Sequence, residues 1–476
     1  MAYIQFLGAA GTVTGSKHLL STSLGAGGSA YQALVDCGLF QGQKEWRERN
    51  WSNLPVPAAS INAIILTHAH LDHCGWIPRL VKQGFRGPIF ATPATIDLCN
   101  IVLPDSGHLQ EEDAEFHNQR KSSKHEPALP LYTLEEAQQC LQQFVAVPFG
   151  ESKQLCSGLS FRFVRSAHIL GASMAEITLQ QNGGSRRLLF TGDLGRVQDE
   201  EIAPGKVVHH TPQEGENADL LIMESTYGNR LHPTVDPRPE LARVIRETVQ
   251  RGGSIVVPAF AVERTQKFLF MLKDLMEEGQ IPRLPVYADS PMAIQAVKVY
   301  LQHSEEYSEL ARLLIGKYGS PLQWPGFQFC ATAAESKKIN DTKFPCIIVS
   351  SNGMCMGGRI QHHLLQRLPD PRNLILFIGF QAPGTRGAQI KDGEKQVKIF
   401  GQIVPVRAQV ASLEQFSDHA DTPEMLKWLR TFAHPPQTVW LVHGEPASAQ
   451  ALREAVGSAL HWKVEIGQYL QKVPLS

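Results

Sequence analysis

The run THAHLDH at residues 67–73 constrains what this chain can fold into more than any other segment. It directly follows residues 61–66, an apolar run of strand length. On an extended segment, the side chains of His68 and His70 project to the same side. The run therefore predicts a strand that ends in two imidazoles facing one point.

If the chain then turns into the helix suggested by residues 75–81, Asp72 and His73 point back from the first turn of that helix. The segment would thus present two pairs of ligands to two adjacent points. Imidazole nitrogen and carboxylate oxygen together form a ligand set that suits zinc. A polar loop that is rich in histidine by chance is the weaker interpretation.

Further candidate ligands lie at or just after the ends of three other strand-like runs, and they are His168, Asp193 and His443. Ligand sites in α/β proteins collect just past the carboxyl ends of strands. A lone histidine at a strand end is more often a satisfied polar residue than a ligand. Here three strand-like runs each end near a His or Asp, and the chain also carries the 67–73 run. Together these features favour a metal site.

Length and composition agree with an ordinary soluble globular protein. The 476 residues are too many for one ordinary core, so we expect two domains. Hydrophobic residues make up 43% of the chain, and no apolar run approaches the ~20 residues of a membrane helix. Residues 1–8 lack a basic lead and predict a first strand, not a signal peptide. Eight cysteines without a Cys-x-x-Cys pair favour reduced thiols, and we expect a cytoplasmic protein.

The formal net charge of −1 counts against a nucleic-acid partner, because proteins that bind phosphates usually carry a basic surplus or a basic face. Any positive surface must therefore be local. A metal pair would itself concentrate positive charge at the site. The charge therefore counts against a nucleic-acid partner but does not exclude one.

The motifs resemble those of a known superfamily. Four of them match the metallo-β-lactamase superfamily in order and spacing, and they are Asp36 in LVDCG, the 67–73 run, His168 and Asp193. Three further positions are similar to its β-CASP branch of nucleic-acid hydrolases, and they are Glu224, His419 and His443. The similarity runs over nearly the whole chain. By pattern, it resembles bacterial and archaeal ribonucleases that are similar to the endonuclease subunit of the cleavage and polyadenylation specificity factor.

This resemblance implies an α/β fold, a metallo-β-lactamase αββα sandwich with an inserted β-CASP domain that contains a doubly wound parallel sheet. The catalytic domain would occupy residues 1–222 and 400–476, and the insertion residues 223–399. Strand and helix patterns that alternate after Glu224 agree with a parallel sheet.

The resemblance also implies two zinc ions per chain. Two groups of side chains would hold them, the first being His68, His70 and His168 and the second Asp72, His73 and His443. Asp193 would bridge the ions, which would share a hydroxide for in-line attack on phosphorus. Asp72 would also accept a hydrogen bond from that hydroxide.

Three residues would assist the reaction. His419 would donate a proton to the leaving 3′ oxygen, and Glu224 would orient it and favour its charged form. Asp36 would orient a ligand histidine or its loop. The alternatives are that Glu224 and His419 only tie domains together and that Asp36 only caps a turn.

Backbone phosphates would bind to the insertion, which would form one wall of the substrate cleft. The glycine-rich turn at 350–359 follows a strand and leads into a helix, an arrangement that presents backbone N–H groups to an anion. The candidate substrate-binding residues are Ser350, Ser351, Gly353, Arg359 and Arg386. The turn lacks the Walker lysine spacing, so no nucleoside triphosphate site is indicated.

We therefore expect a zinc-dependent ribonuclease that cleaves single-stranded RNA, with internal cleavage favoured over 5′-exonuclease action. A histidine at the position of His443 is associated with RNA-cleaving members of the family. The alternatives are a DNA nuclease of the same fold, a small-molecule metallo-hydrolase, and a catalytically silent RNA-binding protein. A homodimer stays an open expectation, because the sequence does not encode the oligomeric state legibly.

Overall fold

The computed structural model describes most of the chain. The described residues are 2–24, 29–121, 125–181, 184–196, 213, 215, 217–233, 235–308, 311–312, 315–316, 319–320, 324–342, 345–379, 381, 384–413 and 416–475. They form two units. Unit 1 contains Met1–Gln198, Thr211–Leu231 and Asp418–Ser476, and unit 2 contains His232–Ser417.

Unit 1 is built on two seven-stranded mixed sheets. The first sheet has the spatial order β22 (Lys472–Pro474), β1 (Tyr3–Phe6), β2 (His18–Thr22), β3 (Tyr31–Val35), β4 (Ala63–Ile65), β5 (Ile89–Ala91) and β6 (Phe144–Ala146). The second has the order β21 (Val464–Ile466), β20 (Thr438–Val442), β11 (Leu220–Glu224), β10 (Gly184–Phe190), β9 (Ser173–Gln181), β8 (Leu159–Arg165) and β7 (Ser152–Cys156).

The two sheets pack face to face, because alternate residues of their strands are apolar and buried between them. Phe90 of β5 meets Phe161 of β8 with the ring centroids 5.3 Å apart. Phe6 of β1 meets Trp440 of β20 at 5.7 Å. These contacts place the main core of unit 1 between the sheets.

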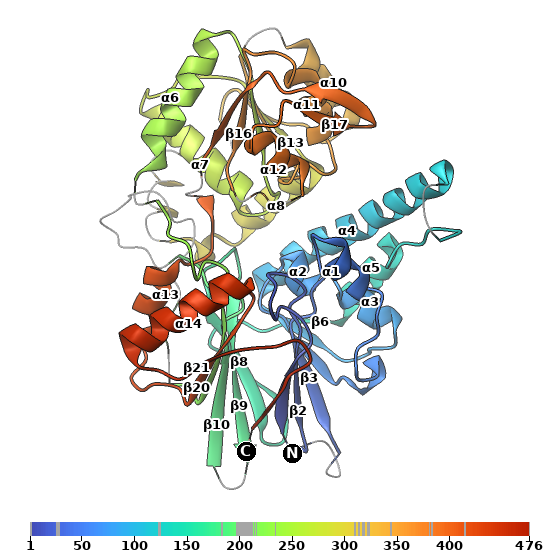
Figure 1. Cartoon of the computed structure of the whole chain (residues 1–476), viewed down its shortest axis with the longest axis vertical. Coiled ribbons are helices and arrows are strands. Elements are labelled where there is room, and N and C mark those ends of the chain that lie inside the picture. Colours follow the sequence, from blue (N-terminus) through green and yellow to red (C-terminus); the bar gives the residue numbers. More distant parts are fainter. Residues whose placement is uncertain are drawn as a thin grey trace. The chain divides into compact units, whose positions relative to one another are not determined.

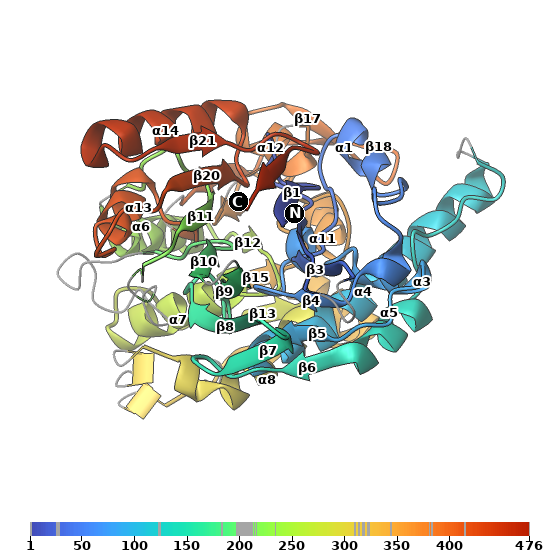
Figure 2. The same cartoon turned by 90° about the horizontal axis from the view of Figure 1, so that it is seen from below.

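Helices cover the outer faces of the sandwich (Figures 1 and 2). The first sheet carries α3 (Ile77–Lys82), α4 (Pro93–Arg120) and α5 (Leu134–Cys140), and the second carries α13 (Thr422–Leu429) and α14 (Pro446–Leu460). Leu221 and Leu441 pack outward against Trp428 of α13 and Leu452 of α14. The layers confirm the predicted αββα sandwich.

Unit 1 is assembled from segments on both sides of unit 2 in the sequence. Strand β20, which follows unit 2, pairs in parallel with β11, which precedes it. Strand β22 pairs antiparallel with β1, with Val473 opposite Ile4, so both ends of the chain lie side by side (Figure 1). The catalytic unit is thus split in sequence and continuous in space.

Unit 2 contains a six-stranded sheet in which all neighbouring strands are parallel. Its spatial order is β14 (Phe327–Phe329), β13 (Val286–Asp289), β15 (Ile347–Ser350), β12 (Ile255–Pro258), β16 (Leu374–Phe377) and β19 (Gln409–Ser412). The helices packed on it include α6 (Pro237–Gln250), α7 (Arg264–Glu277), α8 (Pro291–Gln302), α11 (Ile360–Arg367) and α12 (Arg386–Lys391).

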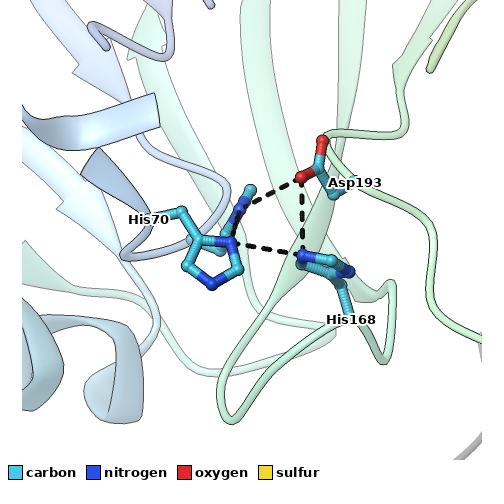
Figure 3. Close-up of side chains that lie close together, drawn as sticks. His70, His168 and Asp193 are labelled. Atoms are coloured by element: carbon cyan, nitrogen blue, oxygen red, sulfur yellow. Dashed lines mark hydrogen bonds and ion pairs between the residues drawn. The ribbon is translucent and has the colours of Figure 1, made fainter. Parts of the chain in front are cut away.

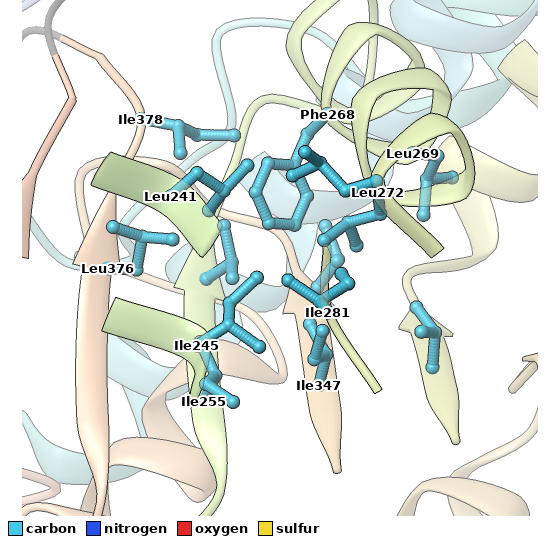
Figure 4. Packing of buried hydrophobic residues seen from close by; sticks show 14 of the residues in the cluster. Leu241, Ile245, Ile255, Phe268, Leu269, Leu272, Ile281, Ile347, Leu376 and Ile378 are labelled. Atoms are coloured by element: carbon cyan, nitrogen blue, oxygen red, sulfur yellow. The ribbon is translucent and has the colours of Figure 1, made fainter. Parts of the chain in front are cut away.

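Side chains of the central strands alternate between two apolar clusters. Ile255 and Leu376 face α6 and α7 in one cluster (Figure 4). Val256 and Phe377 face α11 and α12 in the other. Burial on both faces is what a doubly wound parallel sheet requires, and it confirms the predicted class of this insertion.

The chain returns to unit 1 at Asp418, whereas the sequence analysis expected the return at residue 400. The difference arises because β17 (Gln396–Ile399) and β18 (Gln402–Pro405) form a hairpin, and β19 then adds to the sheet of unit 2 beside β16. None of the eight cysteines is in a disulfide. Within the described residues, no helix combines the length and apolarity that a membrane crossing requires.

Candidate metal centre

Polar side chains gather where the strands of unit 1 end. The carboxyl ends of parallel strands meet at one end of a sheet, and here both sheets contribute. The residues brought there are Asp36 after β3, residues 67–73 after β4, His168 after β8, Asp193 after β10, Glu224 at the end of β11 and His443 after β20.

The 67–73 run bends at His70, because the short helix α2 (Leu71–Cys74) begins there. The backbone N–H groups of His73 and Cys74 both donate to the carbonyl of His70. The helix predicted over residues 75–81 is a separate one, α3. The first turn of α2 still points Asp72 and His73 back toward the strand ends.

The first ligand group consists of His68, His70, His168 and Asp193. Nε2 of His68 and Nε2 of His168 lie 3.1 and 3.2 Å from Nδ1 of His70. Oδ2 of Asp193 lies 3.4 Å from Nε2 of His168 and 3.6 Å from Nε2 of His68 (Figure 3). The candidate ligand atoms all lie within 4.8 Å of one another.

The second ligand group consists of Asp72, His73 and His443. Nε2 of His443 lies 3.2 Å from Nε2 of His73 and 3.5 Å from Oδ2 of Asp72. The other carboxylate oxygen of Asp193, Oδ1, lies 3.2 Å from Nε2 of His73. Asp193 therefore turns one oxygen to each ligand group.

Burial and charge set the protonation of these groups. Burial lowers the pKa of His68, His70 and His168, so these imidazoles are neutral near pH 7 and keep a lone pair for a metal. Burial also lowers the pKa of His73, but Asp193 and Asp36 outweigh it and raise that pKa well above its usual value. A cation at the second ligand group would therefore compete with a proton.

The carboxylate of Asp36 holds a histidine of each ligand group. Its Oδ2 lies 2.7 Å from Nδ1 of His73. Its Oδ1 accepts from both the backbone N–H and the hydroxyl of Thr67, each at 2.9 Å, and that hydroxyl lies 3.0 Å from Nδ1 of His68. Since a carboxylate only accepts, the Thr67 proton goes to Asp36, and Thr67 accepts from Nδ1 of His68. Nε2 of His68 is then left with its lone pair, whereas Nε2 of His73 has a lone pair for a metal only once its proton is lost.

Thr226 makes a similar contact with the second ligand group. Its hydroxyl donates to the carbonyl of His443 at 3.0 Å and lies 3.1 Å from Nδ1 of the same residue. It can therefore accept from Nδ1 while Nε2 faces His73. The sequence analysis assigned no role to Thr67 or Thr226, although Thr67 directly precedes His68 and Thr226 follows Glu224 by two positions.

Glu224 and His419 form a pair beside the first ligand group. Nδ1 of His419 lies 3.1 and 3.2 Å from the two oxygens of Glu224, which is fully buried and also accepts from the backbone N–H of Leu194. Burial disfavours the charged imidazole, but Glu224 outweighs it and raises the pKa of His419 to about 9. The His419 ring lies 4.5 Å from the His168 ring and 6.0 Å from the ring of Tyr227.

The donor set fits a pair of metal ions. Each ligand group points imidazole nitrogens at one another at hydrogen-bond distance, an arrangement that a shared cation stabilises. Nitrogen and oxygen donors in these proportions suit zinc, and the two groups share Asp193 as a bridge would require.

The predicted substrate-binding residues all lie in unit 2. Ser350 ends β15 and donates to the carbonyl of Asp289, while Gly353 lies against the ring of Phe260. Ser351 has a buried hydroxyl without a hydrogen-bond partner among the residues described. Its role in substrate binding stays a prediction.

The two predicted arginines of unit 2 are engaged with protein groups. Arg359 donates to Asp289 and to the carbonyls of Cys330 and Ala331. Arg386 donates to the carbonyls of Lys398 and Cys355. Their role in phosphate binding stays a prediction, and both already have a structural role.

Comparison with known families agrees with this geometry. The chain matches the metallo-beta-lactamase superfamily over residues 27–85, the Beta-Casp domain over 265–390, and the Zn-dependent metallo-hydrolase RNA specificity domain over 403–466. The matches cover the first ligand run, the parallel sheet of unit 2 and the segment that carries the last two motif histidines.

Several characterised proteins are similar to this chain. Ribonuclease TTHA0252 of Thermus thermophilus is 36% identical over 94% of each chain. Transcription termination factor FttA of Methanocaldococcus jannaschii is 29% identical, with 89% of this chain aligned to 65% of that protein. An RNase J-like protein of the same organism is 28% identical over 87% of each chain.

Proposed function

The chain belongs to the metallo-β-lactamase superfamily and to its β-CASP branch of metal-dependent hydrolases, and on this premise we propose that it is a zinc-dependent ribonuclease acting on single-stranded RNA. The observation that carries the proposal is the convergence of two ligand groups on the two oxygens of Asp193. Two such groups suit in-line displacement at phosphorus, where both the attacking and leaving oxygens need stabilisation.

RNA is favoured over DNA and over small molecules for two reasons. The similar protein of Thermus thermophilus is a ribonuclease, and the segment 403–466 matches a domain named for RNA specificity. The unit 2 insertion adds a whole parallel sheet that the hydrolysis of a small molecule does not need.

The protonation and orientation of the ligand side chains favour metal binding. His68, His70 and His168 are neutral, and Asp36, Thr67 and Thr226 favour the tautomers that leave the inward nitrogens unprotonated. When bound, two zinc ions would supply the positive charge that brings the pKa of a water molecule toward ~7 and stabilises the charged phosphate.

The proton for the leaving oxygen comes from His419 in this proposal. Glu224 holds Nδ1, so Nε2 is the nitrogen whose proton is available to the leaving 3′ oxygen. The carboxylate keeps the imidazole protonated near pH 7, which a general acid requires. We further propose that cleavage is internal.

Cleavage of a uniformly labelled single-stranded RNA and of its DNA counterpart tests the proposal. Treatment with a chelator should abolish cleavage, and added zinc should restore it. His70→Ala should lose both metal and activity. An internal product ladder would support endonuclease action, and release of mononucleotides from one end would contradict it. If neither polymer is cut by protein that carries its full zinc complement, the ribonuclease proposal is wrong.

A further inference from the structure

An arginine stacked between two aromatic rings forms a separate feature on the surface of unit 1. The guanidinium carbon of Arg49 lies 4.3 Å from the ring centroid of Trp46 and 4.3 Å from that of Tyr469. Trp46 and Arg49 belong to helix α1 (Lys44–Arg49), and Tyr469 follows β21. Tyr469 is 41% exposed, and the other two side chains are half-buried. We call these three residues the Arg49 cluster.

The guanidinium of Arg49 has no hydrogen bond and no ion pair with any residue in the described part of the chain. Its helix does contain carboxylates, but Glu48 pairs with Lys44 at 3.5 Å. Stacking against rings uses the flat faces of a guanidinium and leaves its N–H groups at the edge. The cluster therefore presents a fixed cation with free donors.

The rings and the helix are held rigidly. The Asn50 side chain accepts from the backbone N–H of Phe40 at 2.9 Å and donates to its carbonyl at 2.7 Å, which anchors the end of α1. The Phe40 ring stacks on Trp46 with an interplanar angle of 15°. On the other side, the backbone of Leu470 is bonded to Phe6 and to the side chain of Gln5, which fixes the loop that carries Tyr469.

The cluster is connected to the metal centre within the same unit. Phe40 follows the loop that starts at Asp36, and this loop runs along helix α2. Its backbone N–H groups at Cys37 and Leu39 donate to the carbonyls of His73 and Leu71, at 2.7 and 2.8 Å. The Arg49 cluster therefore stands at the outer end of a loop whose inner end contacts the second ligand group.

We propose that the Arg49 cluster binds an unpaired nucleotide of the RNA substrate, away from the scissile bond. A backbone phosphate would take the free N–H groups of Arg49, and a base would stack on the exposed ring of Tyr469. Proteins that bind single strands combine cations for phosphates with aromatic faces for bases, and the cluster supplies both. The inference rests on the proposed ribonuclease function and adds to it a contact remote from the metal centre.

The test compares Arg49→Ala with Arg47→Ala. Both variants remove one positive charge from α1, but Arg47 is exposed and makes no cation–π contact with any ring in the described part of the chain. Steady-state cleavage of a long single-stranded RNA should show a KM raised roughly tenfold for Arg49→Ala with kcat preserved, and little change for Arg47→Ala. Tyr469→Leu, which keeps apolar bulk but removes the ring, should raise KM in the same direction.

Two further readouts separate binding from damage to the site. Hydrolysis of bis(p-nitrophenyl) phosphate, which is too small to reach the cluster, should be equal in all three variants and the wild type. The slope of log affinity against log salt for the RNA should fall by about 0.7 for Arg49→Ala if one phosphate contact is lost.

These measurements distinguish failure of the Arg49 cluster to bind RNA from failure of the proposed ribonuclease function. If the wild type does not cut RNA, the ribonuclease proposal fails. If it does cut RNA and Arg49→Ala matches Arg47→Ala in KM and salt slope, the inference is overturned, and a protein partner becomes the better occupant of the cluster. Equal losses on RNA and on the small diester would also overturn it, because the effect would then lie in the metal centre.

Discussion

Oδ2 of Asp36 lies 2.7 Å from Nδ1 of His73, a residue of the second ligand group. The same carboxylate reaches His68 of the first ligand group through the hydroxyl of Thr67. One buried side chain thus orients a ligand in each group, although it is itself a ligand in neither. Its substitution should therefore differ from the loss of any single ligand.

Asp36→Ala should weaken zinc binding at both ligand groups, by roughly 10–100-fold each. His73 would lose its direct partner, and Thr67, the partner of His68, would lose the acceptor that directs its hydroxyl proton away from His68. Titration of the metal-free protein with zinc against a competing chelator measures this. A variant that loses only one of the two ions would show that Asp36 serves one group alone.

Thr67→Val should weaken the binding of the zinc ion at the first ligand group, because Thr67 contacts His68. Thr226→Val should weaken the binding of the ion at the second ligand group, because Thr226 contacts His443. Valine keeps the shape of threonine and removes the hydroxyl, whereas serine at either position should restore the affinity. Thr422→Val is a matched control, because the Thr422 hydroxyl bonds to the carbonyls of Tyr227 and Gly228 in the same loop as Thr226 without contacting His443. Equal zinc loss in this control would assign the effect to the loop and not to the tautomer.

His419→Ala should keep both metal ions and lose RNA cleavage by about 10²–10⁴-fold, the usual contribution of a general acid. Metal content and single-turnover RNA cleavage, measured on the same sample, check that the ions are retained and that cleavage is lost. Retained cleavage would remove His419 from the chemistry.

Glu224→Gln should move the basic limb of the pH–rate profile to lower pH. Glu224 raises the pKa of His419 to about 9, and a general acid is active only below its pKa. Without the carboxylate charge this pKa falls, so activity should decline at a lower pH than in the wild type. An unchanged basic limb would mean that another group controls it.

Arg359→Ala should destabilise unit 2 by about 3 kcal/mol, because it removes one of the two ion-pair partners of the buried Asp289 and leaves only His363. Bonds from His363, Ser336 and Arg359 outweigh burial and lower the pKa of Asp289. In the wild type, this stabilisation is fully present above the unfolded pKa of Asp289, about 3.8, and is lost as the pH falls through the lower folded pKa. Without Arg359 the folded pKa of Asp289 is higher, so the variant should lose stability at a higher pH than the wild type.

Urea unfolding between neutral and acidic pH measures the effect of Arg359→Ala. Arg243→Ala is the control, since Arg243 pairs with carboxylates on the exposed face of α6 and its loss should change little. If Arg359→Ala unfolds like the control and affects only the KM for RNA, Arg359 is a phosphate ligand and not a structural residue.

The sequence predicted the strands, and the structure brings the predicted ligand side chains at their ends together, because apolar runs followed by His or Asp depend on local patterns. The apolar run at 61–66 is found as β4, Ala63–Ile65, directly before the predicted ligands. The hydroxyls of Thr67 and Thr226 could not be predicted, since each contacts a ring nitrogen only after distant segments have met. Thr226 and His443 are separated by the whole of unit 2.

The limits of unit 2 were harder to predict for a related reason. Residues 396–412 look like the alternating strands of the catalytic domain, and only strand pairing assigns them. Phosphate binding by Arg359 seemed plausible from a glycine-rich turn, but the partner that engages it, Asp289, lies 70 residues earlier in the chain.

The pairing of β20 with β11 and of β22 with β1 has a consequence for synthesis of the chain. During translation, every strand of the six-stranded sheet of unit 2 has emerged before β20, and the metal centre lacks His443 until residue 443 is made. A nascent or truncated chain therefore exposes the edges of β11 and β1 and has no second ligand group. The metal-dependent activity proposed above would therefore appear only after β20 has docked and brought His443 to the second ligand group.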